Sequence, residues 1–83
     1  MDLLDYRIGS TLRLDIYDDS NKLIEHDFVS KFEGAINEYE AYIAVPIVEG
    51  VIYAVRVGWI ITVYMVDGNT IYRFRARVVQ RLQ

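Results

Sequence analysis

The stretch WIITVYMVDGNTIYRFRARV, residues 59–78, contains two apolar runs joined by an Asp-Gly dipeptide. Asp-Gly between two runs rich in β-branched and aromatic residues is a strong signal for a tight β-hairpin. In the second run, arginines occupy every second position and apolar residues lie between them. This alternation predicts a strand with one charged face and one apolar face.

The turn sets which side chains face one another across the hairpin. If Val66 lies opposite Ile71, one face of the hairpin carries only apolar residues over 61–65 and 72–76, and we assign that face to the core. The core pairs are then Ile61 with Ala76, Val63 with Phe74 and Met65 with Tyr72. The pairs on the other face are Ile60 with Arg77, Thr62 with Arg75 and Tyr64 with Arg73. A one-residue slip would bury three charges, so the arginines are predicted to point outward.

Four further segments are predicted as strands from their alternation or β-rich composition: residues 12–17, 24–35, 41–45 and 52–57. With the hairpin strands, 59–66 and 71–79, they make six. The DDSN cluster at 18–21 predicts a turn, and Pro46, which lacks a donor N–H, marks a strand end or edge. Such short strands indicate a small antiparallel barrel or sandwich. We expect an all-β fold, a six- or seven-stranded antiparallel β-barrel.

Composition and charge narrow the classes of protein. The chain has 83 residues, 53% of them hydrophobic, and no cysteine, which fits one domain in a reducing cytoplasm. The start lacks the pattern of a signal peptide. The most apolar window, residues 57–66, is half the length that a membrane helix needs, so no membrane insertion is expected. Residues 1–50 hold eleven acids and four bases, whereas residues 51–83 hold one acid and five bases.

Catalytic and metal-binding motifs are weak. His26 is flanked by Glu25 and Asp27, but no cysteine, Gly-rich phosphate loop or nucleophile elbow accompanies it, so we expect an exposed strand histidine. Asp15, Asp18 and Asp19 with Asn21 resemble a calcium loop only loosely, because the alternating oxygens and central glycine are missing. We therefore expect a solvated turn at this position, no metal site and no catalytic residue.

The three arginines of the hairpin form what we call the arginine stripe: Arg73, Arg75 and Arg77. Alternate strand residues lie about 6.6 Å apart, so the stripe could follow a phosphate backbone. However, the net charge is −3, and Tyr72 and Phe74 are expected in the core rather than available for base stacking. Nucleic-acid binding is therefore the alternative. The stripe can also be a protein-docking face, with Tyr64 beside it, or a solvated face that balances the acidic half.

Several segments together resemble a known family. In IAVPIVEGVIYAVRVG, residues 43–58, a PIxxG motif begins at Pro46, and Gly58 follows Gly50 by eight residues; YRFRARV, residues 72–78, has the form YxFRAxV. Ile8-Gly9 and the FVSKF stretch around Ser30 are also similar. The chain resembles, over nearly its whole length, the N-terminal (PilZN) domain of YcgR-type flagellar brake proteins, which precedes a PilZ domain that binds cyclic di-GMP.

The resemblance implies that residues 1–83 form one non-catalytic, regulatory β-barrel domain of motility control, followed by a PilZ domain. In the family, cyclic di-GMP is held by PilZ residues in RxxxR and D/NxSxxG motifs, so no cofactor is expected in this chain. RxxxR occurs here twice, as Arg73 to Arg77 and as Arg77 to Arg81, but within or at the end of a strand, and D/NxSxxG is absent.

The resemblance also implies a set of partners. They are the following PilZ domain, flagellar motor proteins or a second copy of the chain. The arginine stripe with Tyr64 is the candidate docking face. We expect Arg81 to contact the linker between the two domains.

Overall fold

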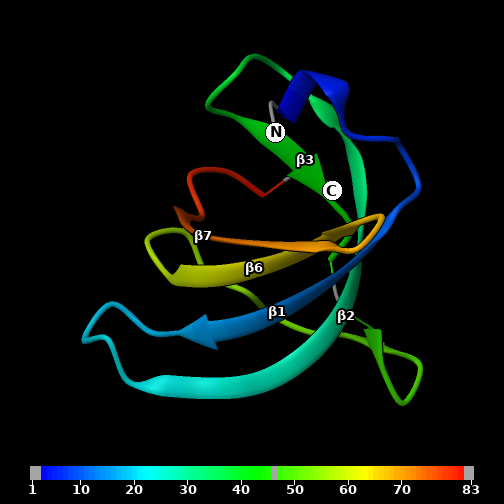
Figure 1. Ribbon diagram of the computed structural model, residues 1–83. Helices are drawn as coiled ribbons and strands as arrows, with labels where there is room; N and C mark the ends of the chain where they lie inside the picture. Colours follow the sequence, from blue (N-terminus) through cyan, green and yellow to red (C-terminus); the bar gives the residue numbers. More distant parts are fainter. Residues whose placement is uncertain (1–2, 46, 82–83) are drawn as a thin grey trace.

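The computed structural model describes residues 3–45 and 47–81 and shows a curled antiparallel sheet (Figure 1). Within these residues, a short 3₁₀ turn, η1 (Leu3–Asp5), precedes seven strands. These are β1 (Thr11–Tyr17), β2 (Leu23–Ala35), β3 (Ala41–Ile43), β4 (Ile47–Val48), β5 (Val51–Ile52), β6 (Ile60–Asp67) and β7 (Thr70–Arg77). Among the described residues, no helix is long and apolar enough to cross a membrane. The all-β prediction is confirmed.

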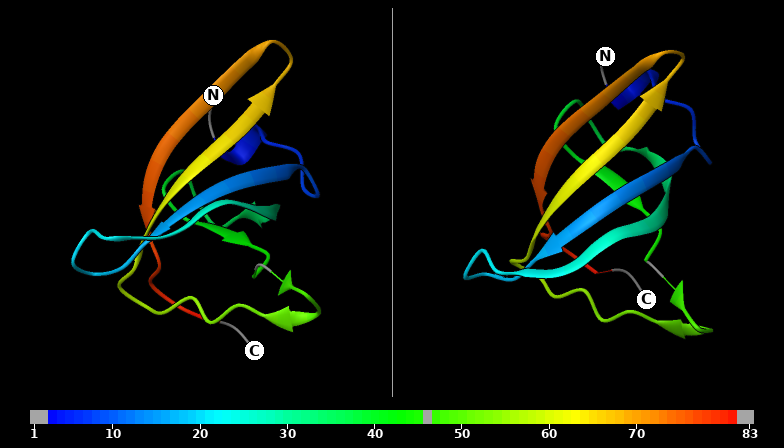
Figure 2. Two further views of the ribbon diagram at one scale, coloured as in Figure 1. Left: turned by 90° about the horizontal axis from the view of Figure 1, so that it is seen from below. Right: turned by 60° about the horizontal axis from the view of Figure 1, so that its bottom comes forward.

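The sheet is a half-barrel and not the closed barrel that the sequence predicts. Among the described strands, five lie in the order β3-β2-β1-β6-β7, and β4 pairs with β5 in a separate hairpin. Figure 2 shows the sheet curling around one side, while the chain between β5 and β6 and the segment after β7 run along the other side without joining the sheet. Closure would require β3 to pair with β7, and neither has a second neighbour among the described strands. Because β3 has only three residues, it offers a short edge for such pairing.

The predicted strand at residues 52–57 is largely wrong. Glu49 (φ 52°) and Gly50 (φ 78°) form a tight turn between β4 and β5. Of the predicted strand, only its first residue, Ile52, is in a strand. The Val55 N–H then donates to the Tyr53 carbonyl at 3.0 Å. This three-residue turn bends the backbone out of an extended ladder. Pro46, predicted to end a strand, lies outside the described residues.

The core lies on the concave face of the half-barrel and is centred on β1. Leu12, Leu14 and Ile16 are at most 1% exposed, because β1 is paired on one side with β2 and on the other with β6. The inward residues of β6 are buried too. By contrast, Phe74 and the other inward residues of β7 are only half-buried. The predicted inward orientation of β7 is confirmed, but its enclosure in the core is not.

The N-terminal segment closes one end of this core. The Tyr6 ring meets Phe32 edge-on, with centroids 5.4 Å apart and planes at 80°. Its hydroxyl donates to the Val66 carbonyl at 3.0 Å, a contact between residues sixty positions apart. Edge-to-face aromatic pairs add to the stability that burial provides. The segment before β1 is therefore part of the fold.

The open side of the half-barrel predicts unequal costs for two similar substitutions. Phe32 is 2% exposed, so Phe32→Ala should cost about 3–5 kcal/mol, as expected for a buried phenylalanine. Phe74→Ala should cost clearly less, because its ring already contacts solvent. Urea denaturation of both variants measures the difference. Equal losses of unfolding free energy would indicate that the Phe74 ring is enclosed and that the half-barrel is not open beside β7.

Candidate functional site

The β6–β7 hairpin has the register predicted from its sequence. Asp67 pairs with Thr70 across a two-residue turn, and Gly68 takes the positive φ of 60° that such a turn favours. The facing pairs across the hairpin are Val66–Ile71, Met65–Tyr72, Tyr64–Arg73, Val63–Phe74, Thr62–Arg75, Ile61–Ala76 and Ile60–Arg77. The arginine stripe therefore lies on the convex face of the sheet.

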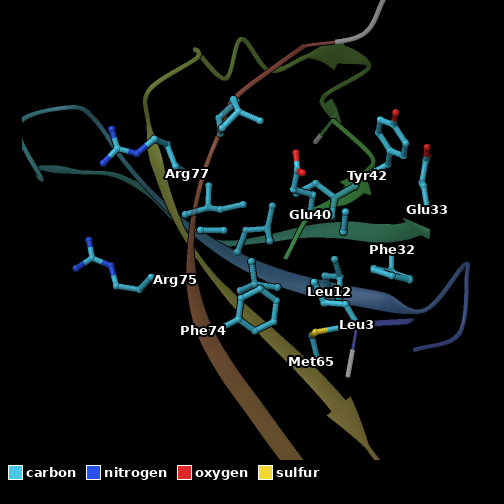
Figure 3. A pocket seen from close by; sticks show the side chains of 18 of the residues that line it. Leu3, Leu12, Phe32, Glu33, Glu40, Tyr42, Met65, Phe74, Arg75 and Arg77 are labelled. Carbon is cyan, nitrogen blue, oxygen red and sulfur yellow. The ribbon is translucent and has the colours of Figure 1, made fainter. Parts of the chain in front are cut away.

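Each arginine of the stripe is exposed. In Figure 3, Arg75 and Arg77 project away from the side of β7 on which Phe74 enters the concave face. Arg75 is held by the β1–β2 connection, since its Nη2 donates to Asn21 Oδ1 at 2.8 Å. Its guanidinium also lies 5.6 Å from the centroid of the Tyr17 ring, within the range of a cation–π interaction. Within the described chain, none of the three forms an ion pair.

Tyr64, the other predicted member of this face, connects it to a buried carboxylate. Its hydroxyl donates to Asp15 Oδ2 at 3.2 Å. Asp15 Oδ1 lies 2.7 Å from His26 Nδ1 and accepts the Asp27 N–H at 2.9 Å. Asp15 is only 6% exposed. The two oxygens thus have three partners from the two neighbouring strands, β2 and β6, as a buried carboxylate requires.

A β-bulge in β2 creates these contacts. Leu14 pairs with Phe28 and Ile16 pairs with Glu25, so β2 has one more residue than β1 between the two pairs. Asp27 takes a positive φ of 58° there, which turns its N–H toward Asp15. Bulges commonly redirect a side chain and bend a strand. The carboxylate of Asp15 therefore holds the bulge by bonding its backbone.

The contacts of Asp15 also change its acidity. Burial alone raises the pKa of the Asp15 carboxyl, but the hydrogen bonds from the Asp27 N–H and His26, the charge of His26 and the Tyr64 hydroxyl together hold that pKa below its usual value. Burial raises the pKa of Tyr64, and the negative charge of Asp15 raises it further. At neutral pH, Tyr64 is a neutral donor and Asp15 a charged acceptor.

Sequence reasoning missed the burial of Asp15. Asp15 alternates with Leu14 and Ile16 and so faces away from the core, but the expectation that it belongs to a solvated turn is wrong, because contacts with β2 and β6 bury it. The available signal is local: His26 and Asp27 interrupt the alternation of β2 at the position where the bulge forms. His26 itself is exposed, as predicted.

The acids near residue 18 form a capped turn. Asp18 Oδ1 accepts the backbone N–H groups of Ser20 and Lys22, both at 2.9 Å. Asn21, the neighbouring amide, binds Arg75 instead of facing the acids. No group of three or more His, Cys, Asp or Glu residues within ranges 3–45 and 47–81 could hold a metal ion.

The concave face forms an apolar groove of about 1180 Å³. It lies beneath the inward side chains of the sheet and is open between β3 and β7. Figure 3 shows Leu12, Phe32, Met65 and Phe74 in this groove, with Glu33 and Glu40 toward its β3 side. Glu38 also borders the groove, as do the three arginines of the stripe. The two rims of the groove thus carry opposite charges.

Comparison with protein families identifies the domain type. The family model PilZNR, described as "Flagellar protein YcgR", matches residues 7–83. The chain belongs to this family. Neither the curated proteins nor the solved structures include a match to it. The resemblance inferred from PIxxG and YxFRAxV is therefore confirmed by a match over nearly the whole chain.

The fold places the family-like segments of this YcgR-family domain at distinct structural positions. YxFRAxV covers residues 72–77 of β7 and Val78, the residue that follows the strand. Ser30, within FVSKF, is buried and donates its hydroxyl to the Ala44 carbonyl, which joins β2 to the chain after β3. The stretch from Arg73 to Arg77 lies wholly within β7, and Arg81 is exposed beyond the strand. Contact of Arg81 with an interdomain linker stays a prediction.

The lowered pKa of Asp15 predicts a pH-dependent cost for its replacement. A carboxylate whose pKa is lowered in the folded state stabilises the fold above its unfolded pKa of about 4, and this stabilisation is lost as pH falls through the folded pKa. Asp15→Asn should therefore lower the free energy of unfolding by about 1–3 kcal/mol at pH 7, since hydrogen bonds to a charged group are lost. The difference from wild type should shrink below about pH 4.

Denaturant unfolding from pH 7 to pH 3 measures this difference. Asp19→Asn is the control, because Asp19 is an exposed acid of the neighbouring turn. A pH-independent difference between Asp15→Asn and wild type would show that the charge of Asp15 does not stabilise the bulge.

Proposed function

We propose that this chain is a non-catalytic interaction module of a cyclic di-GMP-responsive flagellar brake, and that its arginine stripe and Tyr64 dock a PilZ domain. Membership of the YcgR family supports the brake context. The observation that carries the docking face is the arrangement of three exposed arginines without ion pairs in the described chain, on a rigid hairpin of defined register.

The chemistry of the face suits protein recognition. Arginine bonds carboxylates through two parallel N–H groups and stacks on aromatic rings, and it is enriched at interfaces for these reasons. Arg75 is positioned by Asn21 and Tyr17, so less side-chain freedom is lost on binding. Tyr64 is fixed by Asp15. Flagellar motor proteins and a second copy of the chain are the other candidate partners of this face.

Replacement of the stripe by serine tests the docking face. The triple variant Arg73→Ser, Arg75→Ser and Arg77→Ser should keep the fold, because exposed sites lose within about 0.5 kcal/mol each. Its affinity for a PilZ domain of a YcgR-family protein, added as a separate chain, should fall at least about tenfold, since several charge-assisted hydrogen bonds are lost. Calorimetric titration measures the affinity, and thermal melts check the fold.

A charge-matched variant is the control for this experiment. Arg7→Ser, Lys22→Ser and Arg56→Ser together remove the same charge from exposed positions outside β7. If this variant loses as much affinity as the stripe variant, the effect is one of net charge and the docking face is refuted. Unfolding of the stripe variant would instead show that the arginines stabilise the sheet.

Nucleic-acid binding is the alternative function and has its own test. The convex face offers few rings for base stacking, because Tyr17 lies against Arg75 and Tyr64 is half-buried. We expect single-stranded DNA to bind no more tightly than about 10⁻⁶ M at physiological salt, the edge of non-specific binding. Fluorescence anisotropy with a labelled oligonucleotide measures this. Tighter binding with a steep salt dependence would favour the alternative.

A further inference from the structure

The outer edge of β7 has no partner strand among the described residues. The Val78 N–H donates to the Trp59 carbonyl at 2.9 Å, which continues the β6–β7 ladder. In an antiparallel strand, the backbone N–H and C=O groups of alternate residues point to opposite sides. Counting back from Val78, the groups of the three stripe residues therefore point away from β6. Within the described sheet, β7 has no neighbour on that side.

The apolar side chains next to this edge are incompletely covered. Across the hairpin, Ile61, Val63 and Met65 on β6 are at most 6% exposed. Their partners on β7 are apolar as well, yet all are half-buried. The side chains of β7 on the concave face are apolar, but no further element packs beside them within the described chain, so they remain partly exposed. One more strand beside β7 would cover these side chains.

The charge of the arginine stripe indicates which side chains such a strand would carry. A strand added to β7 would place alternate side chains on the convex face, directly beside the arginine stripe. Opposite charges in adjacent strands are stabilising and like charges are destabilising. Acidic residues therefore fit the convex positions of the added strand, and apolar residues fit the positions facing the groove.

We propose that the open edge of β7 binds an extended segment of a partner protein, in which acidic and apolar residues alternate, as an additional strand of the half-barrel. The backbone of the segment bonds the edge, its apolar side chains enter the groove and its acidic side chains lie beside the arginine stripe. The proposal rests on the proposed function as an interaction module and adds the conformation and chemistry of the partner segment.

Two features favour a partner segment over a second copy. The chain's own free edge on β3 has only three residues, whereas β7 has eight. Two copies joined through their β7 edges would bring arginines beside arginines, which is repulsive. Charged side chains also protect strand edges from non-specific pairing. The arginines of β7 would repel a basic strand but would attract an acidic one, so an acidic segment can still pair with this edge.

Amide hydrogen exchange of the 83-residue chain tests the proposal directly. The probe is an eight-residue peptide, Glu-Val-Glu-Phe-Glu-Val-Glu-Phe with blocked ends, which matches the length of β7. In the free chain, the amides of the stripe residues should exchange faster than those of Tyr72 and Phe74. Saturating peptide should slow the stripe amides. A peptide with lysine in place of glutamate should leave them unchanged.

A pair of variants separates backbone pairing from charge. Arg73→Ser and Arg73→Pro remove the same charge, but only proline removes the N–H at the open edge. Proline is tolerated on edge strands, and retained protection of the Phe74 amide checks the β6–β7 ladder. Affinity for the peptide should fall roughly tenfold further in the proline variant than in the serine variant, because an edge hydrogen bond is lost and the ring blocks close approach.

The outcomes distinguish this proposal from the docking face. Equal affinities of the two Arg73 variants, or no slowing of the stripe amides by the glutamate peptide, would overturn the added strand. The docking face would still stand if the triple-serine variant lost the PilZ domain. Slowing of the stripe amides with rising chain concentration, without peptide, would identify a second copy as the occupant and overturn the partner segment.

Discussion

A two-residue turn at Gly68 and Asn69 fixes β7 against β6, and the other features of the surface depend on that register. Shifted by one residue, the same strand would direct three guanidinium groups into the core and three apolar side chains into solvent. The facing pairs, such as Val63 with Phe74 and Tyr64 with Arg73, instead separate the two sets completely. The charged face and the apolar groove are thus two sides of one strand.

The pairing of β1 with β2 depends on a different constraint, the carboxylate of Asp15. It bonds the bulged residues His26 and Asp27 of β2 and the Tyr64 hydroxyl of β6, and so joins the strands on both sides of β1. A bulge increases the local bend and twist of a strand. In this position it allows the long β2 strand to follow the curl of the half-barrel while Leu14 and Ile16 stay buried.

The sequence determined the local features and left open those that depend on distant contacts. The hairpin could be predicted because its turn, its alternation and the cost of burying Arg75 all favour one register. Closure could not, because it depends on whether β3 and β7 meet, and no periodicity describes a pairing between strands so far apart in the chain. The segment after Ile52 was assigned to a strand from its β-branched residues, whereas a turn at Tyr53–Val55 bends it away. The burial of Asp15 depends on the backbone of Asp27, which composition does not reveal.

Tyr6 bears on where this domain begins. The family match starts at residue 7, yet the preceding ring is 9% exposed, packs against Phe32 and bonds the end of β6. A fragment trimmed to residues 7–83 would keep all the described strands but lose the Tyr6 ring, which packs against Phe32 at one end of the core. The physical boundary of the domain therefore lies upstream of the boundary that family similarity defines, and it includes Tyr6 and η1.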